Sequence, residues 1–256
     1  MKLYAYVKKG LLHKEGVCED TVLAGTTLLK GGYLEMELPE RFLVGVADGV
    51  GGEEAGEIAS GLTMLRLAEL DAGKLTKENL RIKLEEINEE ILAVGKDHWE
   101  FQRMSSTLML CGIVGDGTFY ASVGNSRLYR CVMRNGIRQL SKESEDHTLL
   151  NDLIRFGEPE ELCVEDIINT PRAKMLTSHV GMHKEMFSRK LEMGEMEFSN
   201  TVRYILTSDG IHDHIGYEDL KQFVCQEKMS CQLLENIIQK AIDAGSKDDL
   251  SIVVIE

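Results

Sequence analysis

The sequence predicts an α+β fold in which antiparallel β-sheets are covered by helices. Two observations support this prediction. Apolar, strand-like runs are spread over the whole chain, and the long amphipathic segments between them come as a pair rather than alternating singly with strands. A doubly wound parallel sheet needs a helical crossover between successive strands, so this order disfavours it. No Pro- or Ser-rich stretch divides the 256 residues, and we expect a single domain over 1–256.

The predicted strands are short apolar runs bounded by turn residues. Residues 107–114 and 118–132 flank the turn 115–117, which predicts a β-hairpin. Residues 42–47 end at Asp48-Gly49, and residues 203–207 end shortly before Asp209-Gly210. The last run, 250–255, directly follows Asp248-Asp249. Acidic residues therefore stand at the ends of three predicted strands.

Helical periodicity marks three further segments. In 77–94 the apolar residues recur at steps of four and three, which places them on one face of a helix. Residues 53–70 and 231–244 show the same pattern, and Gly245 is expected to end the last helix. Trp99 and Phe101 are expected in the core. Residues 144–194 lack a clear period, so we expect an irregular segment that includes a flap.

Net charge excludes some classes of partner. The chain carries a formal charge of −14, which repels phosphate backbones and anionic membrane surfaces. We therefore expect neither nucleic acid nor a membrane as a partner. The first ten residues do not have the pattern of a signal peptide, and no apolar run approaches the roughly 20 residues of a membrane helix. We expect a cytoplasmic protein.

Cysteine and histidine patterns do not favour a zinc site. None of the six cysteines forms a C-x-x-C pair, and several stand in apolar runs, as buried reduced thiols do. His212 and His214 flank Asp213, but no further His or Cys cluster accompanies them. A structural or surface role is the expectation for both histidines.

The acidic residues at strand ends favour a site for hard cations. A single Asp-Gly pair is a common turn, so each acidic pair by itself predicts little. Glu19-Asp20 precedes a fourth apolar run, 21–24. Carboxylates that converge at one sheet edge raise one another's pKa, and a divalent cation removes that repulsion. Oxygen ligands are typical of Mg²⁺ or Mn²⁺ sites.

Six segments, taken in chain order, resemble the motifs of one family. They are CED (18–20), VADGVGGEEAGEIAS (46–60), SST (105–107) with ASVGNSRLYR (121–130), EDHTLLNDLIRFG (145–157), LTSDGIHD (206–213) and GSKDDLSIVV (245–254). Together they resemble the metal-dependent Ser/Thr protein phosphatases, protein phosphatase type 2C. Val50 and the short loops resemble the compact bacterial branch. The resemblance implies a four-layer α-β-β-α sandwich, with two antiparallel sheets stacked face to face and helices on both outer faces.

The resemblance also implies a role for each acidic residue. Asp48 bridges two Mn²⁺ or Mg²⁺ ions, the Gly49 carbonyl ligates one, and Asp209 and Asp248 ligate the other. A water activated between the ions hydrolyses phosphoserine or phosphothreonine, so Asp48, Asp209 and Asp248 are the catalytic residues. Glu19, Asp20 and Asp249 are expected to act from the second shell or through water. The expected partners are a cognate Ser/Thr kinase and its substrates, and the expected state is a monomer.

Two departures from the family pattern open alternatives. The family's phosphate-binding arginine is Glu15 here, and the adjacent Lys14 is a possible phosphate contact. The aspartate that helps to bind a third metal is Asn125, which predicts a weakened third site. One alternative is a catalytically weak relative that binds phosphoproteins or regulators. Another is an unrelated metal hydrolase acting on small phosphoesters.

Overall fold

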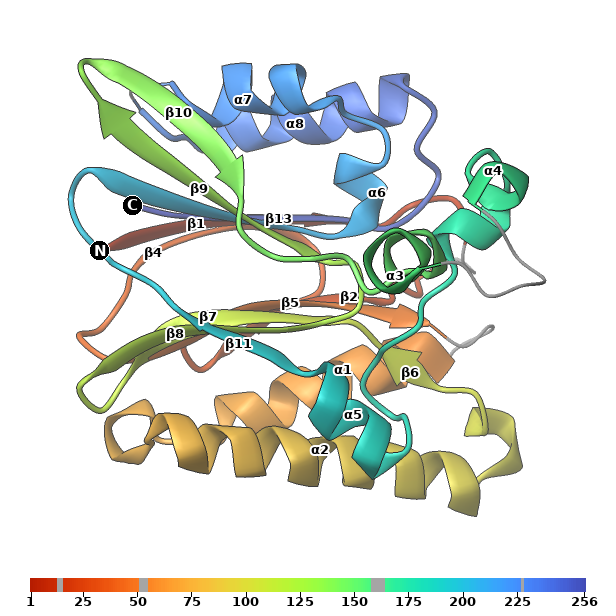
Figure 1. The fold of residues 1–256 in the computed structure, drawn as a ribbon. Coiled ribbons are helices and arrows are strands. Elements are labelled where there is room, and N and C mark those ends of the chain that lie inside the picture. The colour runs from red at the N-terminus through yellow and green to blue at the C-terminus, as the bar shows by residue number, and fades with distance from the viewer. Residues whose placement is uncertain (13–15, 51–54, 158–163, 227) are drawn as a thin grey trace.

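The computed structural model describes residues 1–12, 16–50, 55–157, 164–226 and 228–256. Two β-sheets stack face to face, and helices lie on the outer face of each (Figure 1). Every strand pairing within the two sheets is antiparallel. The predicted α+β class and its four-layer α-β-β-α order are confirmed.

The first sheet joins both ends of the described chain. Its six strands lie in the order β10 (Ile137–Lys142), β9 (Arg127–Arg134), β12 (Val202–Thr207), β13 (Leu250–Ile255), β1 (Lys2–Lys8) and β4 (Gly32–Glu37). The N-terminal strand β1 pairs with the C-terminal strand β13, with Leu3 opposite Ile255. Strands β12 and β13, which lie next to the two late acidic motifs, are therefore neighbours at the centre of this sheet.

The second sheet contains the first two acidic motifs on adjacent strands. Its order is β11 (Glu192–Glu195), β8 (Gly117–Val123), β7 (Leu108–Val114), β5 (Phe42–Val50), β2 (Asp20–Ala24) and β3 (Thr27–Leu29), and the short β6 (Ser105–Ser106) pairs with the end of β5. Asp20 of β2 stands opposite Asp48 of β5. The register therefore brings these two carboxylate-bearing residues together across one strand pair.

The alternation of side chains explains why the strand sequences read as continuous apolar runs. In β13, Val253 and Ile255 pack in the layer between the sheets, whereas Ile252 and Val254 pack under the covering helices. Successive side chains of a strand point to opposite faces, so a strand buried on both faces needs apolar residues at every position. Central strands β12 and β13 are buried along their whole length.

Amphipathic helices form the two outer layers. Helices α1 (Ala55–Ala68), α2 (Lys77–Asp97) and α5 (Lys184–Lys190) cover the second sheet, and α7 (Tyr217–Val224) and α8 (Cys231–Asp243) cover the first (Figure 1). Helix α2 begins as predicted, because the Thr76 side chain accepts a hydrogen bond from the Asn79 N–H at 3.2 Å. Its stripe is buried at Leu80, Leu84, Ile87 and Ile91.

Two expectations need correction. The predicted strand 118–132 is two strands, β8 and β9, which lie in different sheets. The break falls at Gly124, whose φ of +103° disfavours other residues and where a Cβ would lie 2.7 Å from the Thr107 side chain. Trp99 is not in the core, since 77% of it is exposed, whereas Phe101 packs against the core edge.

The irregular segment 144–194 has more regular structure than its sequence predicts. It contains α3 (Leu149–Phe156), α4 (Val164–Ile167), the 3₁₀ turn η3 (Pro171–Lys174), α5 and part of β11. Of these elements, α3 and α4 lie at one end of the sandwich, and β11 lies along the edge of the second sheet (Figure 1). Each helix is short, and the apolar stripe of a helix of one or two turns is too brief to give a period. Whether part of this segment acts as a flap stays a prediction.

Two expectations from composition have structural counterparts. Cys18, Cys111, Cys131, Cys225 and Cys231 are free, and Cys18, Cys111 and Cys131 are buried, as predicted for reduced thiols. Cys163 lies outside the described residues. No helix in the described part of the chain combines the length and apolar character needed to cross a membrane.

Candidate metal centre

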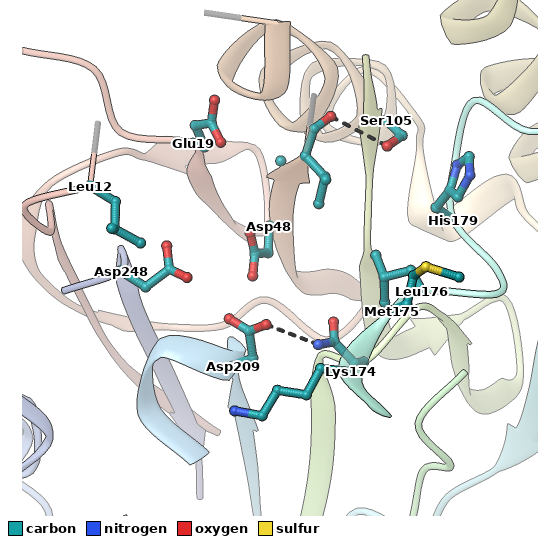
Figure 2. A pocket seen from close by; sticks show the side chains of 13 residues that line it. Leu12, Glu19, Asp48, Ser105, Lys174, Met175, Leu176, His179, Asp209 and Asp248 are labelled. Carbon is teal, nitrogen blue, oxygen red and sulfur yellow. Dashed lines mark hydrogen bonds between the residues drawn. The ribbon is translucent and has the colours of Figure 1, made fainter. Parts of the chain in front are cut away.

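A cavity of about 570 Å³ opens at the edge where the acidic strand ends meet (Figure 2). Asp48 reaches it from the end of β5, and Asp209 from the start of the short helix α6 (Asp209–His212), two residues after β12. Asp248, which precedes β13, and Glu19, which precedes β2, complete its acidic lining. Four segments far apart in the sequence thus present carboxylates to one space.

The backbone around Asp48 is fixed from both sides. Its N–H donates to Thr107 Oγ1 at 3.0 Å, and its carbonyl accepts from the Thr107 N–H at 2.8 Å and from Ser106 Oγ at 3.1 Å. On the other side, the Gly49 N–H donates to the Glu19 carbonyl at 3.0 Å. With its backbone groups used in this way, Asp48 holds its carboxylate at a defined place on the cavity wall.

Two glycines allow this wall to be closely packed. A Cβ on Gly49 would lie 2.0 Å from the Gly56 carbonyl oxygen, so only glycine fits where β5 passes the start of helix α1. A Cβ on Gly56 would lie 2.7 Å from the Glu19 carboxylate oxygens. The pair therefore brings the Gly49 backbone and the Glu19 carboxylate close to the helix and leaves both at the cavity.

Serine residues hold the two late acidic motifs in place. Ser208 Oγ donates to Asp20 Oδ2 at 2.7 Å and accepts from the Ser251 N–H at 2.9 Å, which ties β2 to β12 and β13. Ser246 Oγ donates to the Gly210 carbonyl at 2.9 Å. Asn125 Nδ2, from the turn between β8 and β9, donates to Asp209 Oδ2 at 2.9 Å. The carboxylates of Asp20 and Asp209 therefore each accept a side-chain hydrogen bond from another segment.

The aspartates at this edge oppose one another's ionisation. Desolvation first, and then the charges of Asp209, Asp20 and Asp248, raise the pKa of Asp48 well above its usual range. Desolvation also raises the pKa of Asp209, and Asp248 and Asp213 raise it further, although the Asn125 hydrogen bond acts against them. Like charges gathered in a poorly solvated place have this effect in general. The described protein provides no cation that cancels it for Asp48.

The residues present fit a divalent cation, by their chemistry. The donors are carboxylates and a backbone carbonyl, which are the oxygen ligands typical of Mg²⁺ and Mn²⁺. Asp20 Oδ1 is buried and makes no hydrogen bond among the described residues. Within those residues, no group of three or more His, Cys, Asp or Glu side chains is already drawn together around one point. The carboxylates instead line a shared cavity, as ligands do when water completes the coordination.

Comparisons with known proteins extend over nearly the whole chain. No family model matches it. It is 28% identical over 235 residues to the serine/threonine phosphatase stp of Listeria welshimeri, with 88% of each chain covered. It is 25% identical over 221 residues to the protein phosphatase PhpP of Streptococcus pneumoniae, with 84% of this chain and 85% of that one covered.

Solved structures agree with these relatives. The serine/threonine phosphatase PstP/Ppp of Mycobacterium tuberculosis superimposes with a TM-score of 0.75 at 25% identity, and covers 99% of this chain and 98% of its own. The chain is thus similar over more than four fifths of its length to bacterial serine/threonine and protein phosphatases, and a Streptococcus pyogenes relative among them is named a putative protein phosphatase 2C-type. A likeness in fold alone extends to the S. agalactiae serine/threonine phosphatase, at TM-score 0.74 and 22% identity with 98% of each chain covered.

The structure brings together most of the predicted site residues. Asp48, Gly49, Asp209, Asp248, Glu19 and Asn125 all line the one cavity. Asp20 and Asp249 lie behind its wall. Asp249 is buried and accepts from the Gly10 N–H at 2.7 Å and the Glu19 N–H at 2.6 Å, so it positions the segment before β2. Their ligand roles, and those of the lining residues, stay predictions.

Some expectations cannot be placed, and others were missed. Lys14, the possible phosphate contact, and Glu15 lie outside the described residues. Leu12, Ser105, Lys174, Met175, Leu176 and His179 also line the cavity, and sequence reasoning named none of them as site residues apart from the SST motif. Four of these belong to the segment 144–194. That segment has no clear hydrophobic period, so its sequence does not indicate which side chains face the cavity.

The family's Asp-His-Ser segment and the His-x-His pattern have structural roles here. His147 donates its N–H to the Gly124 carbonyl at 2.8 Å, and its Nδ1 accepts from the Gly124 N–H at 3.1 Å, so it supports the turn that carries Asn125. His212 is buried, with Nδ1 2.8 Å from Thr207 Oγ1. Burial lowers the pKa of His212 well below its usual value, as expected of a neutral core imidazole.

Proposed function

We propose that this chain is a phosphoprotein phosphatase that hydrolyses phosphoserine and phosphothreonine with two Mn²⁺ or Mg²⁺ ions. The observation that carries the proposal is the set of mutually repelling aspartates, Asp48, Asp209 and Asp248, around one open cavity. The relatives named serine/threonine phosphatase, which match nearly the full length, support the same reaction. A protein that only binds phosphoproteins has no physical need for such a charge cluster.

The proposed metal ligands are Asp48, the Gly49 carbonyl, Asp209 and Asp248, with Glu19 acting through water. Bound there, the ions would supply positive charge for the phosphoryl oxygens and a water of lowered pKa for attack on phosphorus. Asp48 is suited to the shared position because its backbone is held by Thr107 and Ser106. Asp209 is held by Asn125, so its carboxylate keeps one orientation as substrate enters.

Direct attack by water fits the rest of the cavity. Among the described residues that line it, Ser105 is the one hydroxyl, and its Oγ donates to the Val50 carbonyl at 3.3 Å. Within the described residues, no hydrogen bond joins that hydroxyl to a basic side chain that would activate it as a nucleophile, so the residues favour a mechanism without a phosphoenzyme. Val50 itself has no proton to give to the leaving oxygen.

The test is phosphate release from a phosphothreonine peptide with Mn²⁺, with Mg²⁺ and with EDTA. We expect release that needs a divalent ion and that falls by about a hundredfold or more in Asp209→Asn, because a ligand is lost. Asp116→Asn, in the exposed hairpin turn, is the matched control and should behave as wild type. Metal binding without any release by the wild type would instead favour the phosphoprotein-binding alternative. Faster release from a small aryl phosphate than from the peptide would favour the small-phosphoester hydrolase.

We also propose a cognate Ser/Thr kinase and its phosphorylated targets as partners, and a monomer as the working state. These follow from the proposed reaction and from the kind of protein that the relatives are named as. Light scattering after size exclusion tests the oligomeric state, and dephosphorylation of an autophosphorylated kinase tests the partner. The cytoplasmic location expected from the sequence stays a prediction.

A further inference from the structure

One side chain with a fixed positive charge lines the cavity among the described residues, and it is Lys174. The lining is otherwise acidic, polar or apolar, apart from His179. A phosphate monoester is a dianion near neutral pH, and cationic side chains are the usual protein partners of such a group. Position 15, where the family resemblance implies a phosphate-binding arginine, carries glutamate. The cavity therefore has one described candidate for this task.

The backbone of Lys174 is built into the structure rather than hanging over it. Lys174 ends the 3₁₀ turn η3, where the Met175 N–H donates to the Arg172 carbonyl at 3.1 Å. The Leu149 N–H of α3 donates to the Met175 carbonyl at 2.9 Å. The Thr177 N–H donates to the His147 carbonyl at 3.0 Å, and His147 in turn supports Gly124, beside Asn125. A continuous set of hydrogen bonds thus fixes η3 relative to the cavity wall.

The side chain of Lys174 lies on the Asp209 side of the cavity. Its Nζ is 2.7 Å from Asp213 Oδ2, and the Asp213 N–H donates to the Asp209 carbonyl at 2.9 Å within the same helical turn. Figure 2 shows Lys174 extending below Asp209, with Asn125 bonded to Asp209 from the neighbouring wall. Asp213 therefore holds the ammonium group beside the helical turn that begins with Asp209, one of the proposed metal ligands.

The ion pair with Asp213 is weak enough to be exchanged. The Lys174 side chain is 64% exposed and that of Asp213 is 20% exposed. Pairs of this kind contribute little to stability, because water screens them and two side chains must be ordered. A dianionic phosphoryl group offers more charge and more acceptor oxygens than one carboxylate. Lys174 is thus held ready near the cavity without being committed to Asp213.

We propose that Lys174 binds the phosphoryl group of the substrate and sets its affinity, with Asp213 acting as its resting partner. This inference rests on the proposed phosphatase function of the same cavity. Lys174 is a binding and positioning residue in this account and takes no proton from the reaction. The competing explanation is structural: the Lys174–Asp213 pair only fastens η3 to α6. The two accounts make different predictions for the two halves of the ion pair.

The experiment compares Lys174→Met, Lys174→Arg and Asp213→Asn with Arg172→Met, an exposed cation of the same turn, as control. We expect Lys174→Met to raise KM about tenfold or more for both a phosphothreonine peptide and a small aryl phosphate, since a charge-assisted hydrogen bond is lost. The change in kcat should be smaller. Lys174→Arg should restore KM, Arg172→Met should leave it unchanged, and Asp213→Asn should leave it unchanged or lower it.

A binding measurement separates this inference from the proposed reaction. Calorimetric titration of the Mn²⁺-loaded protein with inorganic phosphate should show affinity weakened by the same factor in Lys174→Met, even if the wild type releases no phosphate from the peptide. The inference is overturned if Asp213→Asn weakens binding as Lys174→Met does, or if Lys174→Met binds phosphate like wild type. It is also overturned if only peptides with acidic flanking residues are affected, because Lys174 would then read the flank. Equal thermal midpoints of all four variants exclude misfolding.

Discussion

Two buried carboxylate sites at the same end of the sandwich have pKa values shifted in opposite directions. Asp146 is 9% exposed, and burial by itself raises its pKa, but the hydrogen bonds and charge of Arg127 outweigh burial and hold the pKa below its usual range. Arg127 Nη2 is 2.6 Å from Asp146 Oδ2, and Lys142 Nζ is 3.1 Å from Oδ1. For Asp48 the same desolvation is reinforced by its neighbours' charges, and its pKa rises well above the usual range.

The two sites differ in whether the protein itself supplies a counter-charge. Asp146 meets its counter-charge within the protein, and so its site is complete as folded. Asp48 and Asp209 meet other carboxylates, and their neutralising charge must come from a bound cation or a proton. A second cavity, also about 570 Å³, lies between the 25–26 and 36–43 segments and residues 70–73, without such a cluster. Electrostatic imbalance, and not volume, therefore distinguishes the metal centre.

The largest expected effect is that of Asp48→Asn on the acidic edge. We expect metal-dependent phosphate release to fall by about a hundredfold or more, because a ligand shared by the proposed ions is weakened. The thermal midpoint in EDTA should instead rise, since a charge that its surroundings disfavour is removed. Manganese titration and thermal melts of the same samples measure both. A fall in stability without metal would contradict the assignment of Asp48 to an unbalanced cluster.

Removing the cationic partner of Asp146 should mainly lower the stability of the fold. Arg127→Met should lower the free energy of unfolding by about 3 kcal/mol, because it leaves the buried Asp146 carboxylate with Lys142 as its one remaining cationic partner among the described residues. Arg66→Met, which breaks an exposed pair with Glu90, is the control and should cost much less, because water screens that pair. Urea unfolding measures both changes. If Arg127→Met/Asp146→Asn is as unstable as the single variant, the penalty does not come from the unpaired carboxylate.

The pH dependence of stability should differ between metal-free and metal-loaded protein. Raised pKa values at Asp20, Asp48 and Asp209 mean that the folded metal-free protein holds protons that the unfolded chain has lost. Its stability should therefore fall as pH rises above the usual aspartate range of about 4. Asp146 acts in the opposite sense, and its contribution is lost only below about pH 4.

Urea midpoints at several pH values, in EDTA and in excess Mg²⁺, measure this difference. With the ion bound, the fall in stability above the usual aspartate range should be reduced or absent, because the aspartates are then ionised and paired. Parallel curves with and without Mg²⁺ would show that the cation does not bind at these carboxylates.

The smallest expected effect is that of Asn125→Asp, which adds a fifth acidic residue to the cavity lining. Asn125 now donates to Asp209, and aspartate in its place turns this donor into an acceptor. We expect the Mn²⁺ stoichiometry measured by equilibrium dialysis to rise by one weakly held ion, in line with the weakened third site predicted for the wild type. Asn125→Ser, which adds no charge, is the control. An unchanged stoichiometry in Asn125→Asp would show that this position does not limit a third site.

The site residues that the sequence predicted share one property: a pattern within a short stretch of chain is enough to recognise each of them. Asp48, Asp209 and Asp248 each stand within two residues of a strand boundary, so an apolar run followed or preceded by an acid was enough to place them. The helix Lys77–Asp97 was predicted closely because its stripe spans many turns. Residues 13–15 and 51–54 lie outside the described residues, so the predictions there stay open.

Hydrophobic period and turn chemistry are local properties of the chain. The sequence alone therefore predicts the strands, the long helices and the acidic residues that stand at the ends of the strands. Three features appear only in the tertiary structure. Residues 118–132 divide between two sheets, Ser208 donates a hydrogen bond to Asp20, 188 positions away, and Lys174 forms an ion pair with Asp213 beside Asp209. These features depend on contacts between distant segments, which no local pattern of residues encodes.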